Sequence, residues 1–224
     1  MKIFSLIFFC SLLSNVIIAQ NAVEQKLSEL CAISEAPGMN FSIIYPDGEQ
    51  ENYSTGYADI EKGELMTPAH CMFSGSIGKT YAIAVIAQLV DEGSLDLNKK
   101  FITYFPDVEW LKELPNINDF TVLHLMQHRS GLPRYAFKPE VWKAAKNDPD
   151  KVWSFEDRLS LIFADTAVHP AGEGFAYSDT GYLLLAMLIE KITGEYYYDA
   201  LQESVIDPMD LKETYGADKR TFHN

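Results

Sequence analysis

The sequence predicts an α+β fold in which a helix and an antiparallel hairpin precede a mainly helical region. Residues 23–33 carry apolar side chains at helical spacing, and residues 39–58 form two strand-like runs around a Pro-Asp-Gly turn. A strongly apolar run follows residue 76, and no strong alternating pattern is present from about residue 95 to residue 205. With 224 residues, the chain is long enough for one sizeable core or two small ones.

The composition is that of a globular protein, with 47% hydrophobic and 22% charged residues. The formal net charge is -14, from 18 basic and 32 acidic residues. Because no basic patch of useful size is present, we expect no nucleic-acid partner.

Residues 1–20 have the pattern of a secretory signal peptide. Lys2 precedes an apolar core, and a small residue stands before the polar stretch, which places cleavage near Ala19 or Gln20. We therefore expect an exported protein, periplasmic or secreted, with no stable membrane span after cleavage. The alternative is an uncleaved N-terminal anchor, although Ser14-Asn15 interrupts the apolar stretch.

Export permits disulfides, and removal of Cys10 with the leader leaves Cys31 and Cys71. Two cysteines do not establish a bridge from sequence alone. Two buried thiols that act as small hydrophobic residues are the favoured reading.

The first elements are a helix over 23–33, ended by Pro37-Gly38, and a hairpin with strands at 39–45 and 51–58. A lone hairpin is marginal in water, so these strands are expected to pair with others. The next helix opens at Ser76 and is apolar nearly all round as far as Val90, which predicts burial at the centre of a domain. Gly93 is its expected C-terminal cap.

Shorter helices are expected further along the chain. Thr121 is a plausible N-cap for a helix at 122–128, and Asp179 or Thr180 for one at 181–192 that ends at Gly194. Two more are expected at 155–163 and 196–205.

Ser76 and Lys79 form a Ser-x-x-Lys pair at the opening of the apolar helix. Residues three apart lie on one helix face, so the hydroxyl and the ammonium are expected within reach of each other. A serine needs a neighbouring base to become a nucleophile at neutral pH, and a lysine can supply one. On its own the pair is weak evidence, since about one is expected by chance in a chain of this length.

Five motifs in order give this pair its context, and with them the chain resembles the serine β-lactamase and penicillin-binding-protein superfamily. The resemblance is strongest to the branch of class C β-lactamases, DD-carboxypeptidases and related esterases, over roughly residues 25–215. The motifs are Gly56-Tyr57-Ala58-Asp59, Phe73-Ser74-Gly75-Ser76-Ile77-Gly78-Lys79-Thr80, Leu125-Met126-Gln127-His128-Arg129-Ser130-Gly131-Leu132-Pro133, Phe175-Ala176-Tyr177-Ser178-Asp179-Thr180-Gly181-Tyr182 and Ile206-Asp207-Pro208-Met209-Asp210-Leu211-Lys212-Glu213-Thr214.

The resemblance implies an antiparallel sheet flanked by helices beside an all-helical domain. Residues 21–94 then belong to the sheet domain, 95–205 form the helical domain and 206–224 return towards the sheet. The family's third motif, Lys-Thr-Gly or His-x-Gly, and the C-terminal strands are missing, so we expect an N-terminal fragment. A natural short form is the alternative.

The resemblance also implies roles. Ser76 is the expected nucleophile, and its backbone N–H one oxyanion donor, the second coming from the third motif. Lys79 is the base, or the charge that lowers the pKa of a partner. Tyr177 carries the proton from Ser76 to the leaving group. Their structural alternatives are an N-cap serine, a surface lysine and a core tyrosine.

Asp179 is the expected substrate-binding residue and departs from the branch's usual Tyr-x-Asn. An aspartate only accepts hydrogen bonds and is negative, so it favours the charged ammonium of Lys79 and opposes a base role for it. It would also shift selectivity away from amides that bear a carboxylate. Ser178-Asp179-Thr180 can alternatively be read as a variant of the class A Ser-Asp-Asn motif.

His124 and His128 have the i, i+4 spacing of two zinc ligands, but no third ligand is evident and His128 lies in a motif that the family uses structurally. We expect no metal and no cofactor.

The expected function is that of an exported serine hydrolase that forms an acyl-enzyme with a lactam, peptide or ester carbonyl. Its partner is then a small-molecule or peptide substrate, and the oligomeric state stays open. The alternative is a penicillin-binding or sensor protein on the same fold that acylates slowly or not at all.

Overall fold

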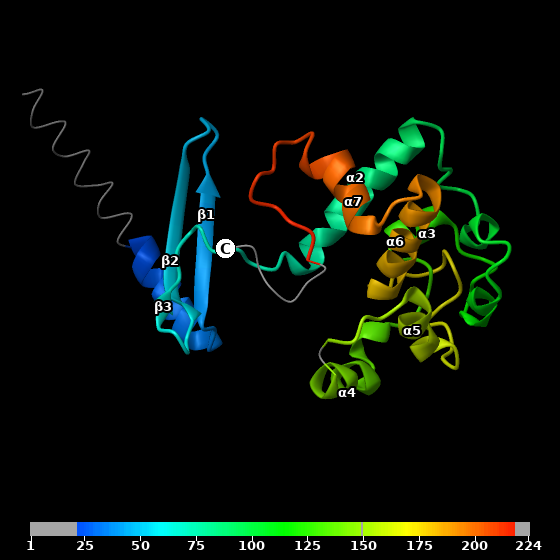
Figure 1. Cartoon of the computed structure of the whole chain (residues 1–224), viewed down its shortest axis with the longest axis horizontal. Helices are drawn as coiled ribbons and strands as arrows, with labels where there is room; N and C mark the ends of the chain where they lie inside the picture. Colours follow the sequence, from blue (N-terminus) through cyan, green and yellow to red (C-terminus); the bar gives the residue numbers. More distant parts are fainter. Residues whose placement is uncertain (1–21, 149, 218–224) are drawn as a thin grey trace, which may run out of the picture. The chain divides into compact units, whose positions relative to one another are not determined.

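The computed structural model describes residues 22–148 and 150–217, which form two compact units divided between Met72 and Phe73 (Figure 1). The predicted leader lies outside the described residues. This division places the Ser76 helix in the second unit. The domain boundary that the resemblance implies, between residues 94 and 95, stays a prediction. No described helix combines the length and apolar character that crossing a bilayer requires.

The first unit holds a helix at residues 22–34 and a three-stranded antiparallel sheet with strand order β1-β2-β3. Its strands are β1 (Gly38–Ile44), β2 (Gln50–Asp59) and the two-residue β3 (Glu64–Leu65). The predicted hairpin is confirmed, and Gly38 pairs with Gly56 at one end of it and Ile44 with Gln50 at the other. The third strand, which the sequence did not reveal, supplies one of the expected additional pairings.

Gly56 explains why the first family motif begins with glycine. Its φ is 77°, in the left-handed region, and a Cβ at this position would lie 2.3 Å from the carbonyl oxygen of Pro37. Only glycine fits this approach of two backbones without displacing one of them.

Few apolar side chains of the first unit are buried. Leu27, Cys31 and Tyr53 form its interior, whereas Phe41 and Ile44 are exposed. The thiol of Cys31 donates a hydrogen bond to the carbonyl of Ala36. Cys31 is buried as predicted, whereas Cys71 is only half-buried, so the prediction of two buried thiols is confirmed for Cys31 alone. No disulfide joins Cys31 to Cys71 in the described part of the chain.

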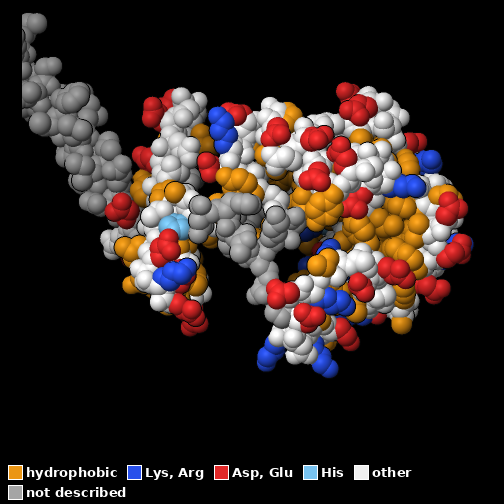
Figure 2. Space-filling model, in the orientation of Figure 1, with side chains coloured by type: hydrophobic (Ala, Val, Ile, Leu, Met, Phe, Trp, Pro, Cys, Tyr) orange, Lys and Arg blue, Asp and Glu red, His pale blue; other side chains and the backbone are white. Residues whose placement is uncertain are grey.

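The second unit is helical and contains a continuous apolar core. Its two longest helices, α2 (Gly78–Asp91) and α6 (Asp179–Thr193), both pack buried side chains into this core. Phe101, Phe120, Leu125 and Leu184 are fully buried in it. Apolar side chains also reach the surface of this unit (Figure 2). Its α-helices are α2 (Gly78–Asp91), α3 (Val122–Met126), α4 (Pro139–Asn147), α5 (Phe155–Leu159), α6 (Asp179–Thr193) and α7 (Tyr197–Leu201).

Several predicted helix ends are confirmed. Thr121 caps α3, where its side chain accepts a hydrogen bond from the backbone N–H of His124. Gly93 follows the end of α2 with φ 74°, and Gly194 caps α6 with φ 76°. Both glycines adopt the left-handed conformation that ends helices.

Other helix predictions need correction. The N-cap of α6 is Ser178, so Asp179 and Thr180 lie inside the helix and their side chains bind elsewhere. The predicted helix at 155–163 is α5 followed by a 3₁₀ turn at Ser160–Ile162, and that at 196–205 is α7 followed by a π-helical turn at Gln202–Ile206. The nine-residue α4 was not predicted.

The prediction that the Ser76 helix is buried all round is wrong. In α2 the buried residues are Ala82, Val85, Ile86 and Leu89, which follow the 3–4 residue spacing of a single face. An apolar pattern on every side does not reveal which face meets a neighbour.

Candidate active site

Ser76 lies in a 3₁₀ turn, Gly75–Ile77, that leads directly into α2. Gly75 has φ 52°, and nothing lies within 4 Å of the position that its Cβ would take. The glycine therefore serves the backbone conformation of the turn rather than a close contact. The turn leaves Ser76 exposed at the beginning of the helix.

The hydroxyl of Tyr177 lies 2.8 Å from Oγ of Ser76, at hydrogen-bond distance, although the two residues are 101 positions apart in the sequence. Tyr177 belongs to the segment just before α6 and is half-buried. The structure thus brings together the serine and the tyrosine that the sequence predicted as catalytic.

Lys79 is in the first turn of α2, and its Nζ lies 5.1 Å from the ring centroid of Tyr177 and 5.4 Å from that of Tyr182. A hydrogen bond from the Lys79 ammonium and its positive charge both lower the pKa of the Tyr177 phenol. Among the described residues, the side-chain partner of Ser76 is Tyr177 and not Lys79. Of the two roles expected for Lys79, this geometry favours the charge that acts on a partner.

The pKa of Tyr177 is set by opposing effects. Burial acts to raise it, but hydrogen bonding with Lys79 and Ser76 and the charges of Lys79 and Arg134 act in the opposite direction. The net result is a pKa below the usual value of a tyrosine. A phenol with a lowered pKa is more often present as phenolate at neutral pH, and the phenolate is the form that can accept the proton of a neighbouring hydroxyl.

Asp179 contacts Arg134, a residue that sequence reasoning missed. Its Oδ1 accepts a hydrogen bond from Nε of Arg134 at 2.7 Å, and its Oδ2 accepts one from the backbone N–H of Ala136 at 3.3 Å. The guanidinium carbon of Arg134 lies 3.9 Å from the ring centroid of Phe137 and 5.2 Å from that of Tyr177. The ion pair of Asp179 is therefore with Arg134, and the expected pairing with Lys79 is not formed.

His128 is a second residue of the site whose role the sequence did not reveal. Its ring centroid lies 4.3 Å from that of Tyr177, and its Nδ1 accepts a hydrogen bond from the backbone N–H of Ser178. His124 lies away from this contact, and its Nδ1 accepts from the backbone N–H of Thr121 instead. Each of the two imidazoles thus has its own partner, and no cluster of three metal-ligating side chains occurs in the described ranges.

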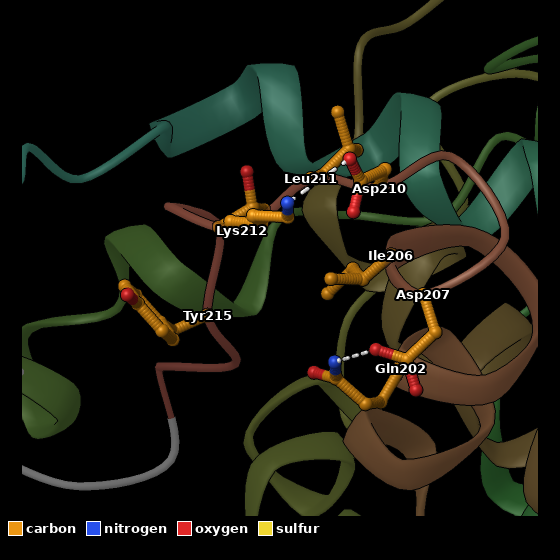
Figure 3. Close-up of a pocket in the computed structure, with 8 residues that line it drawn as sticks. Gln202, Ile206, Asp207, Asp210, Leu211, Lys212 and Tyr215 are labelled. Carbon is orange, nitrogen blue, oxygen red and sulfur yellow. Dashed lines mark hydrogen bonds and ion pairs between the residues drawn. The ribbon is translucent and has the colours of Figure 1, made fainter.

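A pocket in the C-terminal part of the helical unit is separate from this chemistry. Figure 3 shows Gln202 hydrogen-bonded to Asp207, and Lys212 paired with Asp210 at 3.3 Å. None of Ser76, Lys79 and Tyr177 lines this pocket.

Comparison with known proteins gives this group of residues a context. The family described as Beta-lactamase matches residues 23–220. Among curated relatives, "Penicillin-binding protein 4*" from Bacillus subtilis (strain 168) is 30% identical over 188 residues, covering 81% of this chain and 39% of the relative. "Teichoic acid D-alanine hydrolase" from Staphylococcus aureus is 27% identical over 210 residues, covering 90% of this chain and 47% of the relative.

A solved structure is similar in both fold and sequence. The D-amino acid amidase from Ochrobactrum anthropi SV3, complexed with L-phenylalanine amide, matches with a TM-score of 0.75 and 28% identity. The match covers 91% of this chain and 53% of the amidase chain. The chain thus spans less than half the length of these curated relatives and about half that of the amidase.

Proposed function

Because the chain belongs to the β-lactamase family, we propose that it acts as a serine hydrolase that is acylated on Ser76. The observation that carries this proposal is the 2.8 Å contact between the Tyr177 hydroxyl and Oγ of Ser76, with Lys79 beside the tyrosine ring. Serine nucleophiles need a base at hydrogen-bond distance, and this contact supplies one.

In the proposed reaction, the Tyr177 phenolate takes the proton of Ser76 while Oγ attacks the substrate carbonyl carbon. The carbonyl π electrons move onto oxygen and form a tetrahedral intermediate. When that intermediate collapses, the bond to the leaving group breaks, and Tyr177 returns the proton to it. Water, deprotonated by the same phenolate, then attacks the acyl carbon. The bond between that carbon and Oγ of Ser76 breaks, and Tyr177 returns the proton to Oγ, which regenerates the serine and the phenolate.

Lys79 has an electrostatic role in this scheme. Its ammonium favours the phenolate form of Tyr177, which is the form that accepts the proton. The turn at the beginning of α2 contributes the backbone N–H of Ser76 as a donor to the developing oxyanion.

The proposed substrates are amides or esters of amino acids, including D-amino acids. This class is supported by two of the similar proteins, a teichoic acid D-alanine hydrolase and a D-amino acid amidase. A lactam carbonyl is the second candidate, supported by the family match itself.

Asp179 is proposed to tune this selectivity together with Arg134. In their ion pair the Arg134 side chain is 40% exposed and the Asp179 side chain 18% exposed. Asp179→Asn, assayed on a β-lactam and on a simple amino-acid ester, should change the ratio of the two rates, because the variant frees Arg134 from its partner. An unchanged ratio would reject this role.

Export is part of the proposal and rests on the signal-peptide pattern of residues 1–20. The N-terminal sequence of the protein recovered from its native cells should begin after Ala19 or Gln20. A protein that retains Met1 or Lys2 would contradict cleavage.

A covalent probe tests the enzymatic proposal against the binding-protein alternative. The full-length protein is incubated with a fluorescent fluorophosphonate or a fluorescent penicillin, and the labelled band is measured. Ser76→Ala should abolish labelling. Ser74→Ala is the matched control, because Ser74 is also exposed and lies only two residues away, and this variant should retain labelling. Absence of labelling by both probes in a folded parent protein would favour the binding protein.

A further inference from the structure

We propose that His128 is a positioning residue that holds Tyr177 against Ser76, an inference that rests on the proposed function. His128 belongs to the segment after α3, far in sequence from the tyrosine that it contacts. Three separate contacts, two to the backbone and one to the ring, fix the tripeptide Ala176-Tyr177-Ser178.

The two backbone contacts lie on either side of Tyr177. The carbonyl oxygen of His128 accepts a hydrogen bond from the N–H of Ala176 at 2.9 Å. Its Nδ1 accepts one from the N–H of Ser178 at 3.1 Å. Because both neighbours of Tyr177 are held by one residue, the Cα position of the tyrosine is fixed relative to His128.

The third contact fixes the direction of the tyrosine side chain. The rings of His128 and Tyr177 are 4.3 Å apart at their centroids and inclined by 32°. Tyr182, one turn into α6, also lies beside the imidazole, at 5.1 Å. An aromatic contact of this kind restricts the side-chain rotation that would move the Tyr177 hydroxyl away from Ser76.

The backbone of His128 supports a role for the side chain. Its φ is 58°, in the left-handed region, which asparagine, aspartate and histidine adopt more readily than other non-glycine residues. The turn therefore accommodates an imidazole but does not require one, since asparagine and aspartate also suit this conformation. The contacts of the ring with Ser178 and Tyr177 are what require an imidazole at this position.

The hydrogen bond from Ser178 also defines the protonation state. Since Nδ1 accepts, the imidazole must be neutral, with its proton on Nε2. The charged groups that act on it are Lys79, Arg134 and Asp179. Burial is the largest effect on the pKa of His128 and lowers it, the charge of Lys79 lowers it further, and the charge of Asp179 acts in the opposite direction. Protonation in acid would turn Nδ1 into a donor and break the bond to Ser178.

Two variants of the full-length protein separate the contacts. His128→Phe keeps a ring but loses the acceptor, whereas His128→Asn keeps a short acceptor and tolerates the left-handed backbone. His124→Asn is the matched control, because His124 also has a lowered pKa from burial but contacts Thr121 rather than Tyr177.

The measurement is the rate of labelling by a fluorophosphonate as a function of probe concentration and pH. Both His128 variants should lower the limiting rate by about 10- to 100-fold, the scale of a misplaced catalytic group, with little change in the half-saturating concentration. The pH at which the labelling rate falls on acidification should differ between the parent and His128→Asn. His124→Asn should keep both the rate and the pH profile of the parent.

Equal rates and pH profiles in the parent and both His128 variants would overturn the proposal. If the variants do not fold, as judged by thermal melts, ¹⁵N NMR of the parent imidazole decides. An unprotonated Nδ1 at neutral pH supports the proposal, and a protonated one overturns it. If the folded parent is not labelled at all, the proposed function fails, and the same ¹⁵N measurement still decides whether His128 holds the Tyr177 segment.

Discussion

The sheet-bearing unit and the helical unit differ in how completely they bury their apolar residues. The first buries Leu27, Cys31 and Tyr53 and leaves Ile44 72% exposed on a short sheet. The second packs a continuous core around α2 and α6, in which Leu184 is fully buried. The catalytic candidates all belong to the unit that completes its own core, which explains why residues 101 positions apart meet at hydrogen-bond distance.

The largest expected difference between the units concerns two tyrosines. The pKa of Tyr177 is lowered, whereas that of Tyr53 in the sheet is raised to about 12 by its hydrogen bond to Glu51, by burial and by the charge of Glu51. Tyr177→Phe should lower the labelling rate by about 100- to 10,000-fold, as expected for loss of a general base. Tyr53→Phe should leave it unchanged.

A spectroscopic titration sharpens the same comparison. The tyrosinate absorbance lost in Tyr177→Phe should titrate below the usual tyrosine pKa, and that lost in Tyr53→Phe at about pH 12. Equal labelling rates in the two variants, or the reverse order of titration, would contradict the assignment of Tyr177.

Core substitutions should separate the units in stability. Leu184→Ala removes a fully buried side chain of α6 and should reduce the free energy of unfolding by about 2–5 kcal/mol. Ile44→Ala, at an exposed position in β1, should change it by less than about 0.5 kcal/mol. Urea unfolding of the full-length protein measures both. Similar losses would show that β1 is buried in the full-length protein.

The smallest expected effect is a pH dependence of stability in the helical unit. His128 and His124 both have lowered pKa values, chiefly through burial. As pH falls below about 6.5, the unfolded chain takes up protons that the folded chain does not, so these residues reduce stability in acid. Urea unfolding at pH 7.5 and 5.5 should show a smaller pH effect in His128→Asn than in the parent. An equal or larger effect in the variant would contradict the sign.

The elements predicted from the sequence are those with a local signal. The hairpin is predicted by its turn, Pro46-Asp47-Gly48, and helix ends are predicted by Thr121, Gly93 and Gly194. The short β3 has no such signal, because its existence depends on pairing with β2. The helix α4 begins with Pro139 and mixes polar and apolar residues, and no residue in it is buried, so it lacks a clear core pattern.

In the candidate site, too, some features could be predicted from the sequence and others could not. The motifs quoted for the family contain Ser76, Lys79 and Tyr177, and the structure places these residues together. The contacts of Arg134 with Asp179 and of His128 with Ser178 join segments 45 and 50 residues apart. Spacing within one helix or strand carries no information about such pairs. Sequence alone therefore paired Asp179 with Lys79, where the structure pairs it with Arg134.

The central claim is that Ser76 is the nucleophile, and mapping the site of covalent modification tests it most directly. The full-length protein is treated with a fluorophosphonate, digested and analysed by mass spectrometry, with Ser76→Ala and Ser74→Ala treated in parallel. We predict one adduct on Ser76 in the parent and in Ser74→Ala, and none in Ser76→Ala. An adduct on another residue, or an undiminished adduct in Ser76→Ala, would contradict the claim.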